Sequence, residues 1–253
     1  MPPLDVEVSN MNKREQEEYV LKRAEPLLGK LYGKFSVDPD QTDRPDAAIT
    51  VYKPHKRFGC KAEPFRVGIE ITTVDKGDDL AYLNDEKHFH DKVVAQRMDA
   101  LINRIDSDQP TKKVDIKIPT SYIYDGAIRK AGKYHGYFES GTYRQIILLC
   151  FSNRVATGTE VFNEHLLGWT NYFLSRAQFP FDAVVFASLK SGNPVRLYQK
   201  SKPLLVPPPP SSYPDLSETV VHFPTMRTEQ SFNLKKIMPN APLIEKRPPK
   251  PDR

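Results

Sequence analysis

Two acidic residues stand where carboxylates can do chemistry. Asp46 follows Pro45 directly before the apolar residues 47–52, and Glu70 lies in the middle of the apolar residues 65–73. An unpaired carboxylate is costly to bury in such a strand, and two carboxylates on neighbouring strands repel each other. A divalent ion relieves both costs, and oxygen ligands favour hard cations such as Mg²⁺ or Mn²⁺. We therefore predict that Asp46 and Glu70 hold a metal ion for phosphodiester cleavage.

Each acid also has a simpler interpretation. Aspartate after proline is common in turns and at strand starts. Strand alternation permits Glu70 to face solvent together with Gly68 and Thr72. The metal prediction therefore depends on whether the two carboxylates converge in the folded chain.

The elements that must position these acids follow from apolar spacing. Val20, Leu21, Ala24, Leu28 and Leu31 recur at helical intervals and predict a helix over about 12–32, which Pro26 is expected to kink or restart. Period-two and continuous apolar runs predict strands at 47–52, 65–73, 114–118, 146–151, 183–187 and 195–198. Between the strands, helical spacing predicts helices near 86–105, 121–134 and 160–176.

This order predicts the fold class: an α/β domain with a mixed central β-sheet flanked by helices. We assign residues 1–202 to this domain. Residues 203–253 hold 12 of the 23 prolines and show no strong amphipathic repeat. They are expected to form a proline-rich C-terminal tail that is extended or partly docked.

The motif Pro45-Asp46, the strand residues Glu70-Ile71-Thr72, and the helix 127–134 followed by the apolar strand 146–149 resemble the PD-(D/E)XK, or restriction-endonuclease-like, nuclease superfamily. The resemblance covers about residues 12–200 in element order. It implies a Mg²⁺- or Mn²⁺-dependent endonuclease, with Asp46, Glu70 and the backbone carbonyl of Ile71 as metal ligands. Glu17, on the helix face of Val20 and Ala24, would be an accessory carboxylate, although a surface role is the simpler interpretation.

Thr72 departs from this pattern, because it stands where the motif usually has lysine. A catalytic amine positions the attacking water and offsets negative charge. The resemblance implies that another element supplies it, with Lys130 as the first candidate and Lys133 as the second. Both lysines could equally contact phosphate or simply face solvent, so the substitution at Thr72 leaves open whether the site is active.

The composition restricts the kinds of partner and the cell compartment that we expect for this chain. The 253 residues carry a net charge of +5, which is compatible with a polyanionic partner. The first residues lack the features of a secretory signal, and no run approaches the roughly 18 apolar residues needed to span a bilayer. We therefore expect an intracellular, cytoplasmic protein without a membrane partner. Cys150 lies inside an apolar strand and is predicted to be a core thiol.

Three functions compete at this stage. The first is a metal-dependent nuclease, acting on DNA rather than RNA, for which a homodimer would suit two cuts in a duplex. The second is a non-catalytic nucleic-acid-binding protein of the same fold, whose binding would weaken with salt but give no turnover. The third is a protein-interaction factor whose proline-rich tail recruits an aromatic-lined domain.

Overall fold

The computed structural model describes residues 12–41, 43–59, 63–76, 102–103, 112–139, 141–213 and 216–222. The chain divides into two compact units, Met1–Lys76 with Lys117–Glu218, and Gly77–Ile116 with Thr219–Arg253. The central sheet and both candidate sites below belong to the first unit. The helix predicted near 86–105 lies almost entirely outside the described residues.

A six-stranded mixed sheet forms the centre of the first unit, as the sequence predicted. Its strand order is β1 (Gly33–Val37), β2 (Ala47–Pro54), β3 (Phe65–Thr73), β5 (Gln145–Ser152), β6 (Ala183–Ser188) and β7 (Val195–Gln199). Strands β3, β5 and β6 are parallel neighbours. The pairs β1–β2, β2–β3 and β6–β7 are antiparallel. Strand β1 was not predicted, because its sequence GKFSV has little apolar pattern.

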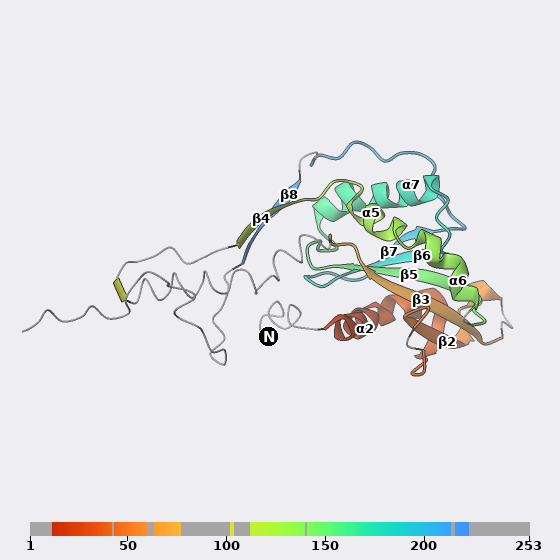
Figure 1. The fold of residues 1–253 in the computed structure, drawn as a ribbon. Coiled ribbons are helices and arrows are strands. Elements are labelled where there is room, and N and C mark those ends of the chain that lie inside the picture. Colours follow the sequence, from red (N-terminus) through yellow and green to blue (C-terminus); the bar gives the residue numbers. More distant parts are fainter. Residues whose placement is uncertain are drawn as a thin grey trace, which may run out of the picture. The chain divides into compact units, whose positions relative to one another are not determined.

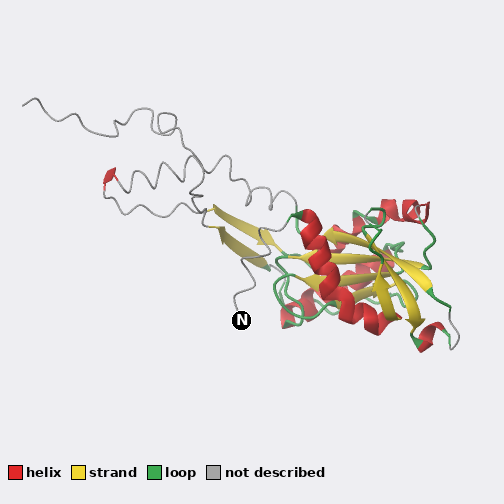
Figure 2. Cartoon of the chain, turned by 90° about the horizontal axis from the view of Figure 1, so that it is seen from below, coloured by secondary structure: helices red, strands yellow, loops and turns green. Residues whose placement is uncertain are grey.

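Helix α2 (Lys13–Tyr32) covers one face of the sheet, and its start is fixed by a capping box. The Asn12 side chain accepts a hydrogen bond from the Glu15 backbone N–H, and Glu15 accepts one from the Asn12 N–H. Pro26 does not restart the helix, contrary to one of the two expectations. Its ring lies on the exposed side, where water can satisfy the carbonyl that proline leaves unpaired. Figure 2 shows α2 lying across the strands.

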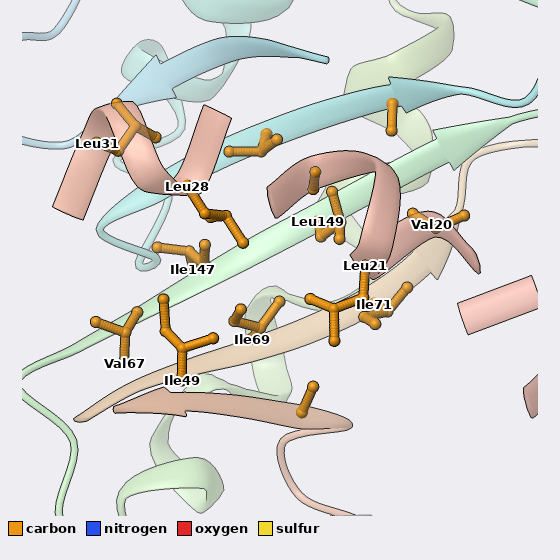
Figure 3. Packing of buried hydrophobic residues seen from close by; sticks show 14 of the residues in the cluster. Val20, Leu21, Leu28, Leu31, Ile49, Val67, Ile69, Ile71, Ile147 and Leu149 are labelled. Carbon is orange, nitrogen blue, oxygen red and sulfur yellow. The ribbon is translucent and has the colours of Figure 1, made fainter. Parts of the chain in front are cut away.

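Helices lie on both faces of the sheet (Figure 1). On one face, α2 packs Leu21 and Leu28 against Ile69, Ile71 and Ile147 (Figure 3). The opposite face carries α5 (Tyr122–Ile128) and α7 (Gly168–Arg176). The remaining short helices are η1 (Lys56–Phe58), η2 (Ala131–Lys133), α6 (Tyr134–Glu139) and the π-helical η3 (Phe162–Leu167). Because strand side chains alternate, Glu70 points to the face opposite Ile69 and Ile71.

Cys150 is fully buried in β5. Burial raises the pKa of its thiol to about 12, which keeps it protonated and unreactive. The prediction of a core thiol is confirmed.

Strand β4 (Lys112–Lys117) pairs with β8 (Ser217–His222) in a separate two-stranded sheet. The strand predicted at 114–118 is therefore present, but it does not join the central sheet. Its partner comes from the stretch that the sequence assigned to the tail. Strand β8 was not predicted, because its pairing with β4 and not its local propensity decides it.

The first part of the proline-rich stretch is anchored on the first unit. The backbone N–H of Leu204 donates to Ser175 Oγ at 2.9 Å, and Ser211 Oγ lies 2.6 Å from His165 Nδ1. The other ring nitrogen of this buried histidine, Nε2, donates to the carbonyl of Ile118 at 2.7 Å. In the described part of the chain, no helix has the length and apolar character needed to cross a bilayer.

Candidate functional site

Asp46 lies directly before β2, after a cis Arg44–Pro45 peptide bond. The β2–β3 pairing begins with Ala47 opposite Ile69, so the backbone N–H of Ile71 lies beyond the strand ladder on this side. Asp46 Oδ2 accepts that N–H at 2.7 Å. The side chain thus satisfies a backbone donor that the strand leaves unpaired, and this contact fixes the carboxylate beside the middle of β3.

Glu70 is 4% exposed and lies in the middle of β3. Its Oε1 accepts a hydrogen bond from Lys130 Nζ at 2.5 Å, in an ion pair whose lysine side chain is 20% exposed. A carboxylate at this depth needs a cation, and the structure supplies an ammonium group. The charged pair joins the centre of the sheet to the segment between α5 and η2.

The position of Lys130 follows from the way α5 is held on the sheet. Buried Asp75, just after β3, accepts hydrogen bonds from Tyr122 at the start of α5 and from Ser152 at the end of β5. Gly126 packs against Val74, where a Cβ atom would come within 2.6 Å of Val74 Cα and Cβ. These contacts bring the end of α5 close to β3 and thereby deliver Lys130 to Glu70.

Asp46 and Glu70 share one electrostatic environment. The pKa of Asp46 is raised to about 6, by burial first and by the charges of Glu70 and Glu17, while the Ile71 N–H and Lys130 oppose this rise. We call Glu17, Asp46 and Glu70 the acid cluster. The charges of Glu70 and of the accessory acid Glu17 both act on Asp46, while Glu70 itself points to the face of the sheet opposite Ile71. Their role as metal ligands stays a prediction.

A cavity of about 430 Å³ opens beside Asp46, and we call it the α2 cavity. Among the described residues, Asp46 Oδ1 receives no hydrogen bond, so one oxygen of this carboxylate is available to a ligand. Lys13 and Glu17 form an ion pair of 3.4 Å in the cavity wall. The lining residues are Lys13, Arg14, Glu17, Glu18, Leu21, Val37, Asp38, Pro39, Gln41, Asp46, Ala47 and Ile71.

The other predicted site residues fall into two groups. Ile71 borders the α2 cavity, and its N–H contacts Asp46. Thr72 Oγ1 donates only to the adjacent carbonyl of Thr73, at 3.4 Å, and makes no contact with the acids. Lys133 is exposed, and within the described ranges it forms no ion pair with either acid. Of the two candidate lysines, the structure therefore places Lys130 at the acid cluster and leaves Lys133 outside it.

Two residues of the site were missed by sequence reasoning. The pKa of Lys13 is raised by Glu17 first, and also by Asp46 and Glu70. The pKa of buried Tyr137, on α6, is raised by burial and then by the charge of Glu70. Lys13 precedes Glu17 by four residues, a helical spacing that could have suggested it. Nothing in the sequence around Tyr137 points to Glu70.

A hard divalent cation needs several oxygen ligands. Within the described ranges, no group of three or more His, Cys, Asp or Glu side chains is arranged to hold a metal ion. Asp46 nevertheless offers an open carboxylate oxygen, and Glu70 a second carboxylate in the same electrostatic environment. Two carboxylates with substrate phosphate oxygens and waters are a common way to bind Mg²⁺. Such an ion would take Asp46 and Glu70 as its protein ligands, with substrate oxygens and waters completing its coordination.

Comparison with known proteins gave no match for this chain, whether among family models, curated proteins or solved structures. The proposed function is therefore derived from the site alone.

Proposed function

We propose that this protein is a metal-dependent nuclease that hydrolyses phosphodiester bonds, with DNA as the preferred substrate. The observation that carries the proposal is the arrangement at the centre of β3: Asp46 with an open oxygen beside a cavity, Glu70 in the same electrostatic environment, and the Lys130 ammonium against Glu70. The mixed sheet with helices on both faces agrees with the restriction-endonuclease-like resemblance that suggested this chemistry.

The chain's own residues have distinct roles in this proposal. Asp46 and Glu70 would hold Mg²⁺ or Mn²⁺, an ion that lowers the pKa of a bound water and stabilises charge on the phosphate. Lys130 would take the role that the motif lysine has elsewhere, because Thr72 carries no charge. Its ammonium group would move from Glu70 toward the scissile phosphate and offset the negative charge that develops there. Lys13, in the cavity wall, would contact a neighbouring phosphate.

The test is cleavage of supercoiled plasmid DNA with Mn²⁺ or Mg²⁺, with a matched RNA as the alternative substrate. The wild-type protein should nick the plasmid, and Asp46→Asn and Glu70→Gln should each abolish nicking. Lys130→Met should lower the rate by about a hundredfold, the usual effect of losing one group that stabilises transition-state charge. Lys130→Arg should restore part of it.

Lys133→Met is the matched control, since it removes an equivalent charge three residues away without contact to the acids. It should leave the rate nearly unchanged. Equal cleavage by wild type and Asp46→Asn would indicate a contaminating nuclease and would reject the proposal. Equal losses in Lys130→Met and Lys133→Met would reject the specific role of Lys130.

One observation favours a second candidate, a nucleic-acid-binding protein without catalysis. The Lys130–Glu70 ion pair already neutralises one of the two acids, and Thr72 replaces the usual motif lysine. This candidate predicts salt-sensitive DNA binding and no turnover with either metal ion. Binding that Asp46→Asn strengthens, in the absence of any cleavage by the wild type, would select it, because removing a negative charge favours phosphate.

A further inference from the structure

A second cavity, which we call the arginine cavity, lies at the amino-terminal ends of β5 and β6 and the end of β7. Its volume is about 230 Å³. The lining residues are Leu31, Tyr32, Arg57, Phe58, Gln145, Asp182, Ala183, Arg196, Gln199 and Ser201. None of them lines the α2 cavity. Phe58 contacts Phe65 at the start of β3, and Glu70 lies five residues further along that strand, about 16 Å away. The arginine cavity is therefore a separate site.

Two guanidinium groups with the same charge face this cavity. The pKa of Arg57 is lowered by burial first, and the positive charge of Arg196 lowers it as well. In the described part of the chain, neither arginine forms an ion pair with an acid. Two cations that line one cavity favour the binding of an anion there.

Aromatic rings hold Arg57 in place. Its guanidinium lies 4.9 Å from the centroid of Phe58 and 5.9 Å from that of Tyr32. The two rings stack on each other with centroids 5.9 Å apart. The N–H groups of a guanidinium point outward in its own plane, so they stay free for a ligand when the group stacks on a ring. The stacked group also loses little conformational entropy when the ligand binds. The arginine is thus pre-organised for recognition.

One acid, Asp182, also borders the cavity, and burial raises the pKa of its carboxyl. Its Oδ2 accepts the backbone N–H of Ile146 at 2.8 Å, and the positive charge of Lys200 acts on it. The neutral groups Gln145, Gln199 and Ser201 supply further polar atoms. The cavity is smaller than the roughly 300–1,000 Å³ of pockets for drug-sized ligands, which favours a small group.

We infer that Arg57 and Arg196 form a phosphate-binding site, separate from the acid cluster. Guanidinium groups match phosphate oxygens with paired N–H donors, and a phosphate can accept from both arginines at once. The phosphate is either that of a free mononucleotide or inorganic ion, or that of a polynucleotide. The inference goes beyond the proposed nuclease function and does not require it.

The experiment measures binding by calorimetry on the full chain carrying Asp46→Asn, in EDTA, so that neither cleavage nor metal binding contributes. The ligands are inorganic phosphate, adenosine monophosphate, and one short DNA strand with and without a 5′-phosphate. Arg196→Gln and Arg57→Gln should each weaken phosphate binding about tenfold or more. Arg196→Lys should recover only part of it, since lysine lacks the planar fork.

Arg176→Gln is the matched control, because it removes an exposed arginine on α7 that lines neither the arginine cavity nor the α2 cavity. It should leave phosphate affinity unchanged. Preference for the 5′-phosphorylated strand would identify a terminal phosphate, equal binding of both strands an internal one, and binding of the small ligands alone a free phosphate. Affinity that neither Arg57→Gln nor Arg196→Gln alters, or no binding of any ligand up to about 10 mM, would overturn the inference. Arg196 is exposed on an edge strand, so its variant should fold normally, which circular dichroism checks.

Discussion

At the residue scale, two opposing influences set the pKa of Asp46. The Ile71 N–H stabilises its carboxylate, while burial and the charges of Glu70 and Glu17 destabilise it, and the second influence is stronger. An aspartate with a pKa near neutrality is the kind of group that a cation or a proton stabilises. Protonation of Asp46 is therefore coupled to the stability of the folded chain.

The first prediction concerns Asp46→Asn and pH. The pKa of Asp46 is about 6 in the folded protein against an ordinary value of 3.8, so the folded state binds more protons between these values. Asp46 therefore stabilises the wild-type protein at low pH, and this stabilisation is lost as the pH rises from about 4 to 6. Asparagine keeps the acceptor for the Ile71 N–H but does not ionise. At pH 8 the variant should be more stable by about 1 kcal/mol, a value reduced for the partial exposure of this carboxylate.

Urea unfolding at pH 8 and at pH 4 measures this difference. At pH 4 the two proteins should have nearly equal free energies of unfolding. A variant less stable than wild type at pH 8 would contradict the stated balance, and would mean that the contact with Ile71 outweighs the charge repulsion.

The second prediction concerns the Lys130–Glu70 ion pair. Lys130→Met removes the cation from a carboxylate that is 4% exposed, and the cost should be roughly 2–3 kcal/mol, below that of a fully buried pair because Lys130 keeps contact with water. Adding Glu70→Gln to Lys130→Met should recover most of this loss. A double-mutant cycle by urea unfolding measures the coupling. Additive effects of the two substitutions would show that the pair contributes no interaction of its own.

At the element scale, short helices decide which side chains reach the acids. The sequence suggested one helix over 121–134, but the structure breaks it into α5, η2 and α6. Lys130 lies at the first break, and Tyr137 on α6 reaches the same glutamate. The chain leaves α5 at this break, and the Lys130 side chain pairs with Glu70 there.

The third prediction concerns the packing of α5 on β3. An Ala at Gly126 would place a Cβ within 2.6 Å of Val74 Cα, a backbone atom that cannot turn away. Gly126→Ala should cost about 1–3 kcal/mol despite the better helix propensity of alanine. It should also lower the proposed nuclease activity, because the shift displaces Lys130.

Gly136→Ala on α6 is the matched control, since no atom lies within 4 Å of its added Cβ. It should be neutral or stabilising by up to about 1 kcal/mol. Thermal unfolding of both variants tests the pair. Equal stabilisation by the two substitutions would show that α5 is not packed as tightly as the contact with Val74 indicates.

At the scale of the whole molecule, part of the proline-rich stretch belongs to the fold. Residues 203–213 run along the first unit, held through Ser175 and the buried His165. The exposed Leu205 and Val206 between these anchors, 67% and 71% exposed, remain accessible to a protein partner. Recruitment of an aromatic-lined domain by the tail 203–253 stays a prediction.

The fourth prediction concerns truncation. A chain that ends at residue 202 loses the Ser211 partner of buried His165 and the Leu204 contact to Ser175, whereas a chain that ends at 222 keeps both. The shorter chain should be less stable by at least about 2 kcal/mol, or roughly 4–8 °C in Tm. Calorimetry of the two truncated proteins provides the measurement. Identical melting temperatures would mean that the anchors contribute nothing and that the fold is complete at residue 202.

The sequence by itself determined the main elements and the residues worth testing. Apolar periodicity located α2, β2, β3, β5, β6 and β7, because burial on one face or two leaves a pattern that a single chain displays. The placement of Asp46 and Glu70 on adjacent strands also followed from order alone, since antiparallel neighbours joined by a short connection pair readily. Cys150 was recognisable from its apolar surroundings.

Only the tertiary structure decided which cation meets Glu70 and which groups form each cavity. Lys130 and Lys133 have the same charge and lie three residues apart, and the packing of Gly126 on Val74 is what separates them. Arg57 and Arg196 line the same cavity although they lie more than a hundred residues apart in the chain, and no local pattern encodes this proximity. Side-chain chemistry is written in the sequence, but distances between charges arise from packing, and at these sites the distances give the residues their roles.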